Sequence, residues 1–150
     1  MKFKPAFTTV IAFLLTTHLY AQKQSFNFSA SVKVDNNMKE LFQEDGRMYL
    51  FLSQNPHAEP RTQTWPNPMY KTYIFAENRK GQKADASVKI DSNGKWMSTA
   101  PWSLDKVPAG EYYVQVLWDQ DQSESRIDAP GNLYSKKQKI QLNKATDLDM

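Results

Sequence analysis

The stretch LDKVPAGEYYVQVLW, residues 104–118, decides the fold class of this chain. From Tyr112 onward its side chains alternate between two faces, with Val114, Val116 and Trp118 on the same face as Tyr112. Gln115 and its odd-numbered neighbours take the opposite face. Period-two alternation in β-branched and aromatic residues predicts a β-strand that starts at Tyr112.

A turn precedes this strand. Pro108 fixes its own φ, and Gly110 can adopt a positive φ that other residues avoid. Tyr112 stands two positions after Gly110, as in the tyrosine corner of β-sandwich proteins, where the hydroxyl bonds to backbone a few residues upstream. We therefore predict such a bond from Tyr112. The alternative is that Tyr112 is only a core aromatic residue at the start of a strand.

Turn residues separate this strand from several others, and no long amphipathic helix follows residue 21. The predicted strands are residues 26–34, 47–53, 70–75, 86–90, 112–119 and 136–142. Strand 47–53 is apolar on both faces, which indicates a central strand or one covered on both sides. The Asn93-Gly94 pair predicts a hairpin that returns at 95–97, whereas residues 146–150 carry no strand pattern. Together these patterns predict an all-β fold, an antiparallel β-sandwich of about seven strands.

The first 21 residues are typical of a secretory signal helix. Lys2 and Lys4 precede a short apolar run at 10–15, and Ala21 supplies a small residue at the cleavage position. The apolar run is shorter than the roughly 20 residues of a membrane span. The sequence thus predicts a signal peptide at 1–21 and one sandwich domain at 22–150, exported to the periplasm or outside the cell, with no membrane span after signal removal.

Charge and cysteine content exclude several classes of function. The chain has 19 basic and 16 acidic residues, and removal of the signal leaves 17 basic residues and a net charge of +1. Such a balance gives no electrostatic reason to expect nucleic acid or an anionic membrane as a partner. The chain has no cysteine, so its core must provide stability without disulfides.

The residue inventory argues against catalysis and against a metal or other cofactor. There is no Gly-x-Ser-x-Gly motif and no cysteine nucleophile, and His57 is the one histidine after the signal. Asp91 and Asn93 begin a calcium-loop pattern that Lys95 interrupts. An acidic loop that includes Asp119 and Asp121 could hold a hard cation, but the number of ligands favours a solvated loop. We therefore predict a protein that is not an enzyme.

Aromatic residues are the strongest candidates for a binding surface. Among the four tryptophans, Trp118 is predicted in the core and Trp102 is predicted to pack beside Pro101. Trp65, in a loop rich in proline, and Trp96 are predicted at the surface. Exposed aromatic rings in secreted sandwich domains can stack on sugars, so these two are candidate ligand-binding residues.

Three stretches together resemble a known family: DGRMYLFLS at 45–53, VPAGEYYVQV at 107–116 and PGNLYSKKQKIQL at 130–142. They are similar to the N-terminal immunoglobulin-like domain of secreted bacterial esterases related to enterochelin esterases. In that family the catalytic residues lie in a following α/β-hydrolase domain, which residues 1–150 do not include, so no catalytic residue carries over.

The resemblance implies structural roles for five residues of this chain and a function for the domain as a whole. The structural residues are Gly46, Gly110, Tyr112, Gly131 and Tyr134. The role is that of a non-catalytic accessory or interaction module, which could pack on a hydrolase domain or another protein partner, or help position substrate. The chain could be a truncated front half of such an esterase. The alternative is a stand-alone carbohydrate-binding module that uses Trp65 and Trp96.

Overall fold

The computed structural model describes residues 28–98, 103–121, 123–142 and 146–149. The predicted signal segment and Trp102 lie outside these ranges. The strands are β1 (Phe28–Val32), β2 (Gly46–Ser53), β3 (Thr72–Arg79), β4 (Val88–Asp91), β5 (Met97–Ser98), β6 (Gly110–Asp119), β7 (Leu133–Tyr134), β8 (Gln138–Leu142) and β9 (Thr146–Asp149). Three short 3-10 helices join them: η1 (Asn36–Leu41), η2 (Pro60–Thr62) and η3 (Leu104–Lys106).

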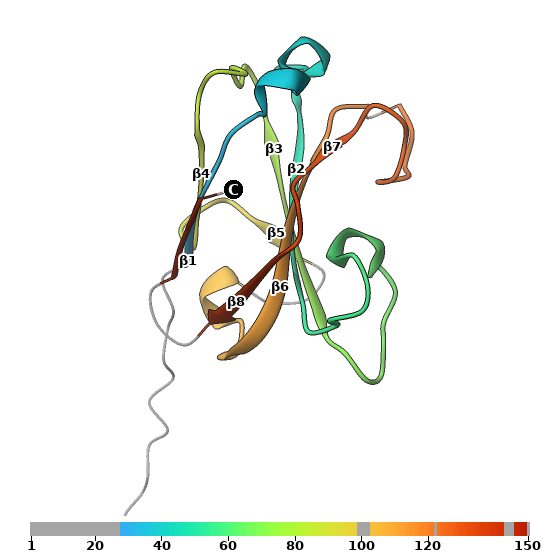
Figure 1. The fold of residues 1–150 in the computed structure, drawn as a ribbon, viewed down its shortest axis with the longest axis vertical. Coiled ribbons are helices and arrows are strands. Elements are labelled where there is room, and N and C mark those ends of the chain that lie inside the picture. Colours follow the sequence, from blue (N-terminus) through green and yellow to red (C-terminus); the bar gives the residue numbers. More distant parts are fainter. Residues whose placement is uncertain (1–27, 99–102, 122, 143–145, 150) are drawn as a thin grey trace, which may run out of the picture.

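The strands form two sheets, which confirms the predicted all-β sandwich (Figure 1). The smaller sheet has the order β4-β1-β9, and the larger has the order β5-β3-β2-β6-β7, with β8 pairing beside β7 along β6. The long antiparallel ladders lie around β2, where Leu50 is opposite Phe75 on β3 and Val116 on β6. The expectation of no strand at 146–150 was wrong, because β9 pairs with β1 there, and it does so in parallel.

The core fills the space between the two sheets. Alternating residues of β6 and β2 point into it, and Tyr112, Leu50 and Phe75 are fully buried. β1 and β4 contribute from the smaller sheet, for example through Phe28 and Ile90. The predicted alternation of the Tyr112 strand is therefore confirmed, because its even-numbered residues are core residues.

The opposite face of the larger sheet is also covered. Phe51 and Leu117 point away from the main core and are nevertheless buried. Helix η2 packs against β2 and β6 and buries Pro60 there. Figure 1 shows η2 and the loop at 120–132 on the side of the larger sheet away from β1 and β4. This covering explains why β2 is apolar on both faces, as predicted for a central strand.

The predicted hairpin at Asn93-Gly94 was wrong. The turn closes with Gly94 N–H donating to Asp91 O at 3.2 Å, but β5 pairs with β3 and not with β4. A tight two-residue hairpin needs positive φ at its central residues, and neither Asn93 nor Gly94 has it. The indole of Trp96 packs edge-on against Phe75 of β3, so the chain crosses to the other sheet.

Candidate functional site

The predicted tyrosine corner is present. The Tyr112 hydroxyl donates to the Pro108 carbonyl oxygen at 2.9 Å, and the side chain is fully buried. Its ring meets the Tyr73 ring edge-on, with centroids 6.0 Å apart. Gly110 has a φ of +157°, so the predicted positive φ is also found. Tyr112 thus fastens the turn at 108–110 to the first residues of β6, and its role in the described chain is structural.

The other residues carried over from the resemblance lie near one end of β6. Gly46 is buried against Trp118: a Cβ at this position would lie 2.7 Å from Cε2 of the indole ring. Gly131 has a φ of +97°, and its carbonyl accepts from the Gln120 side-chain amide at 2.8 Å. Tyr134 is 57% exposed, so it is a surface residue with the Arg61 guanidinium 4.0 Å from its ring centroid.

The structure places Trp65 at the tip of the proline-rich loop with 86% of its surface exposed. Met69, four positions later, is 78% exposed. Between them, the Asn67 side-chain oxygen accepts from the backbone N–H groups of Met69 at 2.8 Å and Tyr70 at 3.2 Å. An Asx turn of this kind gives the loop a defined backbone shape. We call residues 65–70 the loop tip.

Trp96 does not share this exposure. It is half-buried and packs against the core, with its ring centroid 6.4 Å from that of Phe75. Its indole N–H donates to the Asp91 carbonyl at 2.8 Å, which satisfies the one polar group of the ring. Trp96 is therefore only partly at the surface, and Trp65 is the more exposed of the two predicted tryptophans.

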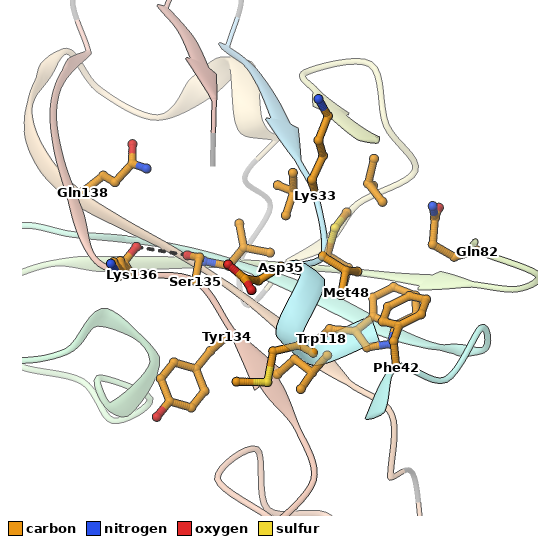
Figure 2. A pocket seen from close by; sticks show the side chains of 16 residues that line it. Lys33, Asp35, Phe42, Met48, Gln82, Trp118, Tyr134, Ser135, Lys136 and Gln138 are labelled. Carbon is orange, nitrogen blue, oxygen red and sulfur yellow. Dashed lines mark hydrogen bonds between the residues drawn. The ribbon is translucent and has the colours of Figure 1, made fainter. Parts of the chain in front are cut away.

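A groove of about 560 Å³ opens between the two sheets beside η1 (Figure 2). Its volume falls within the roughly 300–1,000 Å³ that is usual for ligand pockets. Figure 2 shows Trp118 and Phe42 at one end, stacked with centroids 5.3 Å apart, and Tyr134 at the other. The walls are mostly apolar and include Val32, Val88, Met48, Val116 and Leu133.

The polar groups at the rim of this groove hold the structure together. The Asp35 carboxylate accepts from the backbone N–H of Asn37 and so caps η1. The Ser135 hydroxyl accepts from Val116 N–H at 3.0 Å and donates to the Lys136 carbonyl at 3.1 Å. The Ser135 hydroxyl therefore bonds to the backbone of β6 on one side and to the backbone of its own segment on the other. The groove therefore suits an apolar molecule, and its one lining serine is engaged with backbone.

The acidic loop after β6 has a buried carboxylate at its start. Asp119 is buried, and its Oδ1 has no hydrogen-bond partner. Burial raises its pKa, while a hydrogen bond from Asn132 and the charge of Arg47 act in the opposite direction. Asp121 is more accessible, and the hydroxyl and backbone N–H of Ser123 lower its pKa. In the described part of the chain, no three histidine, aspartate or glutamate side chains converge as metal ligands.

Sequence reasoning missed two features on the outer face of the larger sheet. Gln115 is fully buried and joins the η2 segment to residue 135 through its side-chain amide. Arg61 lies over Tyr134. The sequence held one signal for this cluster: Gln115 lies inside an otherwise apolar strand. A buried side-chain amide needs polar partners, so such a residue indicates a polar cluster beside it. The groove had no sequence signal, because its walls come from segments that lie far apart in the chain.

No helix in the described ranges is long and apolar enough to cross a membrane. The chain matches no family model, no curated protein and no solved structure. We therefore argue its function from its own residues.

Proposed function

We propose that this chain is an exported, non-catalytic interaction module that binds a protein partner through the loop tip at 65–70. The observation that carries the proposal is the 86% exposure of Trp65, which stands two residues before the Asn67 turn. An indole left in water is unfavourable for an isolated domain, and burying it against a partner gains free energy in proportion to the apolar area covered.

The composition of the loop tip favours a protein partner. Tryptophan and methionine are enriched at protein–protein interfaces, and tryptophan is common among the residues that dominate binding energy. Here Trp65 and Met69 are both exposed and lie on either side of the Asn67 turn. A loop already held in one shape loses less conformational entropy when a partner binds. The partner we propose is a hydrolase domain, as in the esterases that the sequence resembles.

The strand order supports the immunoglobulin-like assignment within the sandwich class. β1 pairs with β4 in one sheet, and β2 lies between β3 and β6 in the other. β8 returns along β6, the strand that begins with the tyrosine corner. A corner of this kind at the start of the sixth strand of seven is a feature of immunoglobulin-like domains.

The contacts of candidate catalytic groups support a non-catalytic role. A serine nucleophile needs a base within hydrogen-bond reach, but the Ser135 hydroxyl contacts only backbone in the described chain. His57 lies exposed in the proline-rich loop, where its backbone N–H donates to the Asn55 side chain. A solvent-exposed loop histidine has no surroundings that would orient it as a general base.

Carbohydrate binding is the second candidate, and the exposed face of Trp65 favours it. Sugar platforms commonly combine several rings, and Trp96, half-buried against the core with its N–H bonded to Asp91, is a weak companion for Trp65. Affinity gel electrophoresis in soluble β-glucan, xylan and pullulan tests this candidate. Retardation of the wild-type chain that Trp65→Ala abolishes would favour sugar over protein.

The main proposal is tested by affinity purification from the periplasmic extract, with the wild-type chain, Trp65→Ala and Met97→Ala as parallel baits. Trp65→Ala should leave the free energy of unfolding within about 0.5 kcal/mol of wild type, because the side chain is exposed. Met97 is also exposed but lies on β5. We expect a hydrolase enriched on wild type and Met97→Ala and lost on Trp65→Ala. Equal recovery on all three baits would contradict the proposal.

A further inference from the structure

A second concavity, of about 500 Å³, lies on the outer side of the larger sheet, between η2 and the segment from β7 to β8. The residues that line it are Glu59, Arg61, Tyr134, Ser135, Lys136 and Lys137. Three of these six carry positive charge and one carries negative charge. The concavity is therefore basic in a chain whose overall charge is close to balanced.

Arg61 is held in a fixed position at this concavity. Its backbone N–H donates to the buried Gln115 Oε1 at 3.1 Å, and its guanidinium lies 4.0 Å from the centroid of the Tyr134 ring. Cation–π stacking of this kind orients the plane of the guanidinium and leaves its edge N–H groups available. The Nε atom is buried and has no hydrogen-bond partner. Because Nε is closed off from solvent, a ligand would meet the terminal N–H groups of the guanidinium.

The one carboxylate at the concavity is already engaged. Glu59 Oε2 accepts from the Gln115 side-chain amide at 2.7 Å. The Lys137 ammonium is likewise engaged, with the carbonyl oxygens of Pro56 at 3.2 Å and Ala58 at 3.3 Å. The ion pairs found among the described residues do not include Arg61 or Lys136. Two cations at the concavity are thus left without an acidic partner.

We infer that this concavity binds an oxyanion, a carboxylate or phosphate group, with Arg61 as the principal donor and Lys136 as a second cation. A guanidinium presents parallel N–H groups that match the two oxygens of a carboxylate or phosphate. Its stacking on Tyr134 and the Gln115 anchor reduce the entropy lost on binding. The inference does not depend on the loop tip, because neither Trp65 nor Met69 lines this concavity.

The test is an NMR titration of the full chain with sodium phosphate and, separately, sodium acetate, at constant ionic strength maintained with chloride. The reporter is the side-chain Nε–H resonance of Arg61, with that of Arg47 as the internal control, because Arg47 Nε–H already donates to Asn78. We expect a saturable shift at Arg61 and at the backbone N–H of Lys136, and none at Arg47. The anion with the lower dissociation constant identifies the class of ligand.

Charge-changing variants distinguish a specific anion-binding site from non-specific electrostatic attraction of anions. Arg61→Met should weaken binding about tenfold or more, as the loss of charge-assisted hydrogen bonds implies. Lys136→Glu changes an exposed side chain, and it should also abolish saturable binding. Lys95→Glu makes the same charge change at an exposed turn residue elsewhere and should leave binding within about twofold of wild type. A shift that rises linearly without saturation, or one that persists in Lys136→Glu, would overturn the inference.

Discussion

The Tyr112 hydroxyl donates to the carbonyl oxygen of Pro108, four residues earlier in the chain, at 2.9 Å. This bond links the turn before β6 to the core, because the Tyr112 ring is fully buried while Pro108 is exposed. The strand that follows pairs with β2, β7 and β8, so its starting position sets the register of most of the larger sheet.

Removal of this hydroxyl should destabilise the fold. Tyr112→Phe keeps the edge-on packing of its ring against Tyr73 but loses the hydroxyl's bonds to the Pro108 carbonyl and to the Tyr73 phenol, so we expect the free energy of unfolding to fall by about 1 kcal/mol or more. Urea denaturation followed by circular dichroism measures this. Tyr113→Phe, next along the strand and on its other face, is the matched control and should change stability by less than about 0.5 kcal/mol. Equal loss in both variants would argue against the corner.

Stability should also fall at high pH because of the same residue. Burial, with the neighbouring Tyr73 phenol adding to it, raises the pKa of Tyr112 to about 12 from the ordinary 10.0. The folded state then keeps a proton that the unfolded chain releases, so stability is present below pH 10 and is lost as pH rises toward 12. Denaturation at pH 9, 10 and 11 should show this decline. The decline should be smaller in Tyr112→Phe, and an identical decline would contradict the assignment.

Gly46→Ala should be strongly destabilising. A Cβ at this position would lie 2.7 Å from Trp118 Cε2 and 2.9 Å from the Asp119 carbonyl oxygen, so β2 and β6 would have to separate locally. Overpacking of this kind costs about 1–3 kcal/mol. Thermal unfolding of Gly46→Ala, Trp118→Leu and the double variant measures the coupling. The smaller leucine should relieve part of the cost, and strictly additive losses would show that the contact with the indole is not the cause.

Gln115→Ala should loosen the proline-rich loop. The Gln115 amide accepts from Arg61 N–H and donates to Glu59 and to the Ser135 carbonyl, and all three bonds are lost together. We expect a stability loss of about 2–3 kcal/mol and faster proteolysis within residues 55–71. Gln141→Ala removes an exposed glutamine from β8 and serves as the control. Unchanged proteolysis of the loop in Gln115→Ala would contradict the role of this amide as its anchor.

Much of the fold could be predicted from alternation and turn residues. Strands β1 and β8 lie within the predicted ranges, while β2 and β6 begin one and two residues before theirs, at Gly46 and Gly110. Tyr112, Leu50 and Ile140 face the core because period-two patterning fixes which side of a strand is buried. β9 was missed because a short edge strand that pairs in parallel with β1 carries little pattern of its own. The Asn93-Gly94 hairpin failed because the contact of Trp96 with Phe75, distant in sequence, outweighed local turn preference.

The candidate site was only partly predictable. Loop position and proline content placed Trp65 at the surface, where it lies, but Trp96 is half-buried against the core. Whether an indole ring is buried depends on partners such as the Asp91 carbonyl, which accepts from the Trp96 N–H. A single sequence does not show which partners the fold brings close. The groove and the basic concavity both depend on how β7 and β8 lie beside β6, and pairing over such sequence distances is a property of the folded chain.

The measurement that tests the central claim most directly is photo-crosslinking in the cell. A benzoylphenylalanine placed at position 65, and in a separate strain at position 97, reports which proteins lie within contact distance of the loop tip and of β5. Both positions are exposed, Trp65 to 86% and Met97 to 50%, so a probe at either one reaches the solvent. We predict one dominant crosslinked protein, a hydrolase, at position 65 and none at position 97. The same products at both positions, or no protein adduct at position 65, would contradict the proposal that the loop tip binds a protein partner.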